Sequence, residues 1–236
     1  MPRPIFSRVS CAIALACACA AAPLASAGPL DAITSQEASS GLKAALDAGS
    51  AAAVGKLGVE NGFLGNDKVK IKLPAILEQA RPLLKMTGRG QQLDDLVVSM
   101  NRAAESAIPL AKPLLIDAVK SMSVTDAKNI LTGGDTSVTD FFRQKTATPL
   151  SIKFLPIVKS VTDRSGLASQ YNGVVGQVAK SGLMKVPQQQ ATVEDYVTGR
   201  ALDGLYLMIG EEEKAIRKDP IAYGSKIIGK VFGSLK

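Results

Sequence analysis

The chain contains no histidine and no tryptophan, and its three cysteines, Cys11, Cys17 and Cys19, all lie within the first 27 residues. Residues 28–236 therefore lack the side chain that titrates at neutral pH, the thiol nucleophile and the usual ligands of zinc and copper. No disulfide can form within this part, so packing must stabilise it. We accordingly expect no cofactor, no metal site and no catalytic residue, although the sequence leaves the question of an enzyme open.

Aromatic residues are also scarce, at 4% of the chain. The stacking surfaces with which many proteins bind single-stranded nucleic acid are therefore missing. The formal net charge is +7, and it falls to +5 for residues 28–236 because the first 27 residues hold two arginines and no acid. This small and dispersed excess is typical of a solvated surface, so no nucleic-acid partner is expected.

The first 27 residues have the three parts of a secretory signal peptide. Arg3 and Arg8 come first, residues 9–22 are apolar and uncharged, and Ala25-Ser26-Ala27 matches the small-x-small pattern of a cleavage site. The apolar stretch is shorter than the ~20 residues that a membrane span needs. The sequence therefore predicts cleavage after Ala27 and a periplasmic protein without a transmembrane span in its mature part.

Lipoprotein anchoring is the alternative for this leader. Neither Cys17 nor Cys19 has the leucine three residues earlier that a good lipobox shows. Cleavage at either cysteine would also shorten the apolar stretch. We therefore predict a cleaved signal peptide rather than a lipid anchor.

The sequence of the mature part, residues 28–236, predicts an all-α protein. After a flexible lead-in at residues 28–40, apolar residues recur at three- and four-residue spacing through residues 41–236, which indicates one single-domain bundle of about nine helices. Residues 68–73, Lys-Val-Lys-Ile-Lys-Leu, alternate instead and predict a short extended segment with its lysines facing water.

Local signals divide this pattern into separate helices. Ser123 and Thr192 begin sequences that resemble capping boxes. Thr148-Pro149 is expected to start a new helix, because proline suits a first turn. The longest helix is expected from Thr192 to about Lys218, followed by a basic amphipathic helix over residues 221–235.

Glu212 is the candidate with the clearest physical argument. It falls near the middle of the apolar face of the longest helix, with Glu211 and Glu213 on either side. A carboxylate in a core must find a cation or take up a proton, and Arg102 and Arg143 are the expected cations. The sequence leaves open whether the result is a structural ion pair or a polar cluster that lines a ligand cavity.

Five further residues complete the candidate polar cluster. Asn101, Arg102 and Glu105 share the side of their helix opposite its main apolar stripe, and Asp140 and Arg143 are spaced as an i,i+3 pair. Surface pairing would account for both groups. Serine with lysine is the one plausible nucleophile and base set, and none of these residues lies in a diagnostic motif.

Several strings in the mature part resemble the exported bacterial family known as domain of unknown function 4197. They are Gly62–Leu64 with Val69–Pro74, Ser99–Glu105, Ala111–Pro113 through Asp117–Ala118, Ile130–Thr136 with Asp140–Arg143, Ala201–Leu205 through Glu211–Glu213, and Ile216–Pro220. The likeness extends from about Gln36 to Phe232. It implies an exported, helix-rich protein typical of Gram-negative bacteria, and it implies no activity, cofactor or catalytic residue.

Three functions remain open at this point. The apolar helical pattern favours a non-catalytic protein that binds a protein partner or an apolar small ligand. An envelope hydrolase that uses carboxylates or Ser/Lys is the second, and two carboxyls facing each other across an open cleft would favour it. The third is a peripheral membrane-surface protein that uses the basic C-terminal helix.

Overall fold

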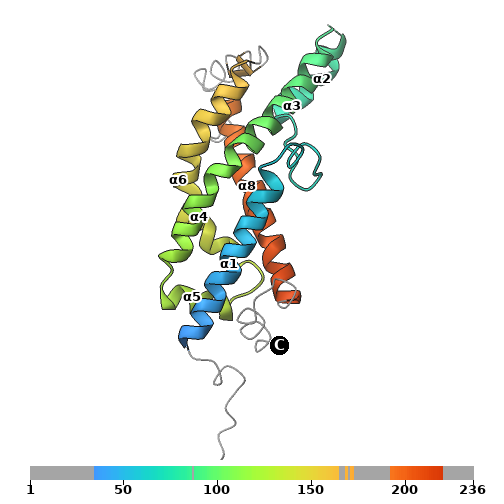
Figure 1. Cartoon of the computed structure of the whole chain (residues 1–236). Coiled ribbons are helices and arrows are strands. Elements are labelled where there is room, and N and C mark those ends of the chain that lie inside the picture. The colour runs from blue at the N-terminus through green and yellow to red at the C-terminus, as the bar shows by residue number, and fades with distance from the viewer. Residues whose placement is uncertain (1–34, 87, 165–167, 170, 173–191, 220–236) are drawn as a thin grey trace, which may run out of the picture.

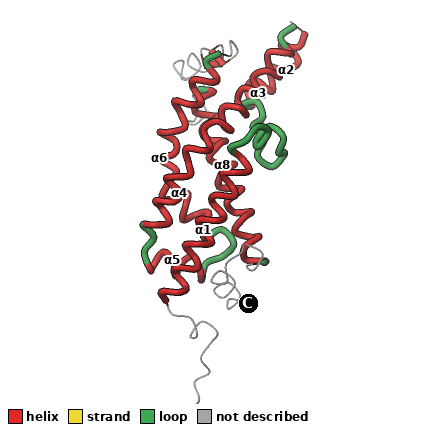
Figure 2. Tube along the Cα trace, in the orientation of Figure 1, coloured by secondary structure: helices red, strands yellow, loops and turns green. Residues whose placement is uncertain are grey.

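The protein is all-α in the part that the structure describes, as the sequence predicts. The computed structural model describes residues 35–86, 88–164, 168–169, 171–172 and 192–219. Helices contain 81% of these residues and none of them lies in a strand (Figure 2). The described helices are α1 (Ser35–Leu57), α2 (Ala75–Met86), α3 (Gly90–Ala107), the 3-10 helix η1 (Ile108–Leu110), α4 (Ala111–Lys120), α5 (Val124–Thr132), α6 (Ser137–Thr162) and α8 (Val193–Lys218).

These helices form an elongated bundle. In Figure 1, α1 and α6 run in one direction, while α8 and the rod made by α3, η1 and α4 run in the other. Helix α2 packs against α3 at one end of the bundle, and α5 packs against α1 and α6 at the other end. The loop of residues 58–74 leaves the end of α1 and returns along α3 and α8 before α2 begins.

One continuous apolar core lies between α1, α3, α4, α6 and α8. Helix α8 contributes Tyr206, which is fully buried and whose hydroxyl is 2.9 Å from Thr146 Oγ1 of α6. Burial raises the pKa of Tyr206 above its ordinary value. Phe63 inserts into the same core from the loop, with none of its surface exposed. The loop is therefore part of the folded unit.

The predicted capping box at Ser123 is confirmed, and the predicted box at Thr192 is confirmed as a side-chain N-cap. Ser123 Oγ accepts a hydrogen bond from the amide of Asp126 at 3.0 Å, and the Asp126 carboxylate accepts one from the Ser123 amide at 3.0 Å. Thr192 Oγ1 likewise accepts a hydrogen bond from the amide of Asp195 at 3.0 Å, at the start of α8. In both helices a side chain satisfies an amide that has no partner within the helix.

Two predicted helix boundaries are wrong. Helix α1 begins at Ser35 rather than Gly41, so residues 35–40 belong to a helix and not to the lead-in. No new helix starts at Thr148-Pro149, because α6 runs without a break through both Pro149 and Pro156. An interior proline costs a helix about 3 kcal/mol, and burial of a continuous apolar face that includes Phe154 and Val158 offsets that cost.

The segment at residues 68–73 shows the predicted alternation without forming a strand. The amides of Val69 and Lys70 both donate to the carbonyl of Asn66, which makes the start of the segment a turn. Its three apolar residues are nevertheless buried and its three lysines exposed. The predicted helix at residues 221–235 lies outside the described residues.

Candidate functional site

A cleft of about 890 Å³ opens between α2, α3, the start of α8 and the loop of residues 58–74. Its volume lies in the range of small-molecule sites, which is roughly 300–1,000 Å³. The lining residues are Leu64, Lys70, Lys72, Leu73, Ala75, Glu78, Arg81, Asp94, Val97, Val98, Tyr196 and Arg200. Apolar side chains from the loop and α3 thus lie beside four cationic and two acidic residues.

The alternating segment explains how two lysines reach the cleft. Because successive side chains of an extended chain point to opposite sides, Ile71 and Leu73 pack into the core while Lys70 and Lys72 face outward. Lys70 and Lys72 line the cleft from this outward side, and Leu73 lines it with the small part of its surface that stays exposed. Neither lysine has an ion-pair partner among the described residues.

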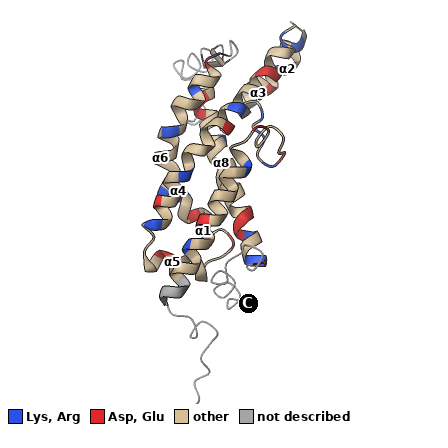
Figure 3. Ribbon diagram, viewed as in Figure 1, with Lys and Arg blue, Asp and Glu red and all other residues tan. Residues whose placement is uncertain are grey.

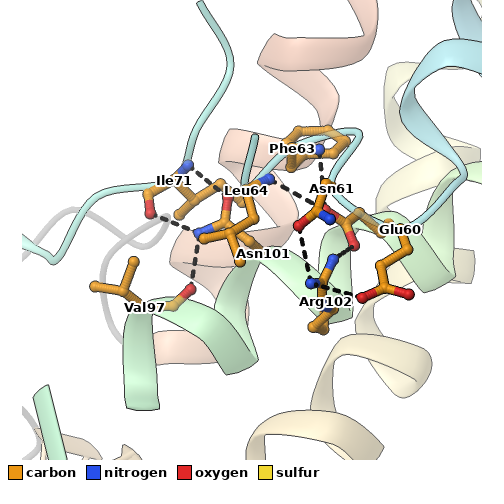
Figure 4. Close-up of polar contacts among 9 residues, drawn as sticks. Glu60, Asn61, Phe63, Leu64, Ile71, Val97, Asn101 and Arg102 are labelled. Atoms are coloured by element: carbon orange, nitrogen blue, oxygen red, sulfur yellow. Dashed lines mark hydrogen bonds and ion pairs between the residues drawn. The ribbon is translucent and has the colours of Figure 1, made fainter. Parts of the chain in front are cut away.

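Asn101 of α3 holds this segment in place by hydrogen bonds to its backbone (Figure 4). Its Oδ1 accepts from the amide of Ile71 at 2.9 Å, and its Nδ2 donates to the carbonyl of Ile71 at 2.9 Å and to that of Val97 at 2.7 Å. Asn101 is completely buried. The side chain therefore pairs with the segment as a neighbouring strand would.

Glu105, one turn further along α3, holds the first part of the loop. Its Oε1 accepts hydrogen bonds from the amides of Phe63 at 3.0 Å and Leu64 at 3.1 Å. Its Oε2 is 2.5 Å from Nη1 of Arg102, whose Nη2 reaches Glu60 at 3.2 Å (Figure 4). Asn101 and Glu105 are therefore not solvent-facing, because the loop covers the side of α3 that the sequence placed opposite its apolar stripe.

The first turns of α8 form the remaining wall of the cleft. The hydroxyl of Tyr196 donates to the carbonyl of Lys72 at 3.1 Å, which ties the lysine segment to α8. Burial raises the pKa of Tyr196, so this hydroxyl stays protonated at neutral pH. The guanidinium of Arg200 lies 5.7 Å from the Tyr196 ring centroid and 3.5 Å from Asp203.

A second cleft of about 410 Å³ lies between α6 and α8 and shares Tyr196 and Arg200 with the first. Arg143 lines it, 4.7 Å from the ring centroid of Tyr206 and 3.5 Å from Asp203. Asp140 instead accepts a hydrogen bond from the Thr136 hydroxyl. The i,i+3 spacing of Asp140 and Arg143 thus does not produce the expected pair.

Glu212 is buried as predicted, but its cation differs from the expected arginines. Lys56 of α1 lies 2.5 Å from Glu212 Oε1, while Arg102 and Arg143 contact other carboxylates. Glu211 lies 2.5 Å from Lys68 of the loop. The Lys68 hydrogen bond lowers the pKa of Glu211. Figure 3 shows acidic residues along this C-terminal half of α8.

Glu213 is a second buried acid among the three consecutive glutamates of α8. The helical spacing placed it beside the apolar face and not in the core. Its Oε1 is 3.0 Å from Arg217 and 3.4 Å from the amide of Val138 at the start of α6. Arg217 also donates to the carbonyl of Ile130 near the end of α5. Burial raises the pKa of Glu213, and its Oε2 has no hydrogen-bond partner among the described residues. The pair thus links α8 to α5 and to the start of α6. Helix α5 lies at the end of the bundle opposite α2 (Figure 1).

The six sequence candidates therefore divide into three groups. Asn101, Arg102 and Glu105 support the loop that forms the cleft. Asp140 and Arg143 lie on α6, and Glu212 pairs α8 with α1. The lining residues Lys70, Lys72, Tyr196 and Arg200 are absent from the candidates, although the alternation of the lysine segment was a visible signal for the first two.

Two further properties of the described residues bear on the site. They include no group of three or more His, Cys, Asp or Glu side chains placed to hold a metal ion. None of the described helices combines the length and the hydropathy that a membrane crossing requires.

The model of the family described as protein of unknown function (DUF4197) matches residues 32–233. The chain belongs to this family, as the resemblance of its sequence strings predicts. The match spans every helix from α1 to α8 that the structure describes. No curated protein and no solved structure matches the chain.

Proposed function

We propose that this DUF4197 family member is an exported, non-catalytic protein that binds a small ligand with an apolar part in the cleft between α2, α3 and α8. The single observation that carries the proposal is the cleft itself, whose volume suits a small molecule and whose lining mixes apolar side chains with a few polar groups. The export part of the proposal rests on the signal-peptide pattern of the first 27 residues.

The acids that line the cleft favour binding over hydrolysis. Glu78 and Asp94 both accept hydrogen bonds from Arg81, at 3.0–3.3 Å, and both are more than half exposed. A glycosidase needs one carboxyl that keeps its proton and a second that is ionised and free to react. Two exposed carboxylates that share one arginine form an ion-pair cluster instead.

Blocking the cleft tests the proposal. Val98 lines the cleft and is 43% exposed, so Val98→Trp places an indole inside it without disturbing the core. Val124 is 68% exposed and lies away from the cleft, so Val124→Trp is the matched control. The readout is the fluorescence of the neutral apolar probe N-phenylnaphthylamine, titrated into each purified protein.

We expect the wild type and Val124→Trp to bind the probe equally, and Val98→Trp to bind it at least about tenfold more weakly, because the indole takes the probe's place. Native mass spectrometry of protein purified from the periplasm should show a bound small molecule in the wild type that Val98→Trp lacks. Equal probe binding by both tryptophan variants, or none by the wild type, would refute the proposal.

A further inference from the structure

We propose that the ligand of this cleft is an anionic amphiphile: Lys70, Lys72 and Arg200 hold its carboxylate or phosphate head, and its apolar part lies on Leu73, Val97 and Val98. This inference rests on the proposed binding function and names the chemistry of what is bound. It is carried by the distribution of charge around the cleft.

The cationic end of the cleft is built from the lysine segment and α8. Lys70 and Lys72 are two residues apart on an extended segment, so their side chains leave the backbone on the same side. The hydrogen bonds of Asn101 to Ile71 and of Tyr196 to the Lys72 carbonyl fix the backbone that carries them. The backbone that carries two lysines without ion-pair partners among the described residues is therefore fixed on this wall.

At the opposite end of the cleft the cation is already paired with acids. Among the described residues that line this end, Arg81 is the one cation, and it bonds to both Glu78 and Asp94. The charge lining the cleft is thus polarised, with a small acidic excess at the α2–α3 end. The loop–α8 end has Arg200 and two lysines that lack ion-pair partners among the described residues. An anionic head will lie at the loop–α8 end, and this fixes the orientation of the apolar part along α3.

Arg200 is the third cation, and Asp203 competes for it. The two side chains are 3.5 Å apart and about half exposed, which is a weak surface pair. Arg200 lines both clefts, so its guanidinium can turn from Asp203 toward an anion in the larger one. Removing the Asp203 charge should therefore strengthen anion binding.

The experiment displaces N-phenylnaphthylamine with probes that share a chain and differ in the head: decanoate, decyl phosphate, decanol and decyltrimethylammonium. Inorganic phosphate serves as a head without a chain. The variants are Lys70→Gln/Lys72→Gln and Asp203→Asn. Their matched controls are Lys112→Gln/Lys153→Gln, which removes two exposed lysines outside the clefts, and Asp163→Asn, which removes an exposed acid paired with Lys159.

We expect decanoate or decyl phosphate to bind at least about tenfold more tightly than decyltrimethylammonium, and salt to weaken only the anions. Lys70→Gln/Lys72→Gln should weaken the anions about tenfold and leave decanol unchanged, while Asp203→Asn should strengthen the anions about threefold. The control variants should match the wild type. Decanoate and decyl phosphate together test which head is preferred.

The outcomes separate this inference from the proposed function. If decanol binds as tightly as the anions and the lysine variant changes nothing, the anion inference is wrong while the binding function stands. If inorganic phosphate alone binds as tightly as decyl phosphate, the ligand is not an amphiphile and the inference is also wrong. If no probe binds the wild type, both proposals fail.

Discussion

Two glycines of α8 should respond in opposite directions to the same substitution. A methyl group at Gly204 would lie 2.7 Å from Cε1 and 3.1 Å from Cζ of Phe63, and 3.3 Å from Cβ of Val69. Both of these loop residues are buried. A methyl group at Gly199 would have no neighbour within 4 Å. The loop therefore packs against α8 at Gly204, where only a hydrogen atom fits.

The magnitudes follow from two opposing effects. Alanine is favoured over glycine in a helix by about 1 kcal/mol, whereas overpacking a core costs about 1–3 kcal/mol. At Gly199 only the first effect acts, so Gly199→Ala should raise the free energy of unfolding by about 0.5–1 kcal/mol. At Gly204 the clash with a fully buried ring exceeds the helical gain, so Gly204→Ala should lower it by about 1–2 kcal/mol.

Urea unfolding followed by far-UV circular dichroism would measure both variants, and thermal melts should show Tm changes of about 2–4 °C per kcal/mol for a domain of this size. A double-mutant cycle identifies the cause. In a Phe63→Leu background the smaller side chain leaves room, so Gly204→Ala should cost less there. If Gly204→Ala stabilises the protein as much as Gly199→Ala, the close packing of the loop on α8 is wrong.

Two further predictions concern buried carboxylates. Glu105→Ala should lower the free energy of unfolding by about 3 kcal/mol, because the amides of Phe63 and Leu64 lose their acceptor. Glu60→Ala removes an exposed acid and should lower the free energy of unfolding by less than about 1 kcal/mol. If urea unfolding shows equal losses for Glu60→Ala and Glu105→Ala, Glu105 does not hold the loop in this way. Burial raises the pKa of Glu213 in the folded protein above its ordinary value of 4.5. The protonated carboxyl therefore contributes fully to the free energy of unfolding below pH 4.5, and this contribution is lost as the pH rises through the raised pKa of the folded state. Glu213→Gln should therefore become more stable relative to the wild type in thermal melts as the pH rises above the ordinary value of 4.5, and a constant difference would show that the pKa is not raised.

The fold class could be predicted because its signals are local. Spacing of apolar residues, the caps at Ser123 and Thr192 and the alternation at residues 68–73 each depend on a few neighbouring residues, and the structure confirms them. The incorrect prediction of a helix start at Pro149 arises because long-range packing decides the structure there. A proline signals a helix start locally, but packing of α6 along the whole bundle outweighs that signal.

The site could be predicted only in part, because its geometry depends on long-range packing. The helical wheel placed Glu212 in the core, yet nothing in the sequence indicated that Lys56, 156 residues earlier, would be its partner. The sequence grouped Asn101 and Glu105 on the side of their helix opposite its apolar stripe, where surface pairing would account for them. The loop that covers this face, and the cleft that the loop forms with α2 and α8, become visible only once the chain is folded.

The three consecutive glutamates near the end of α8 have a consequence for how this sequence can change. Glu211, Glu212 and Glu213 contact the loop, α1 and the start of α6, respectively. Since each residue turns an α-helix by about 100°, inserting or deleting one residue upstream within α8 would swing all three carboxylates away from these contacts at once. Length variation in this helix is therefore penalised far more heavily than substitution, and related sequences should keep the spacing from Gly204 to Glu213 without gaps.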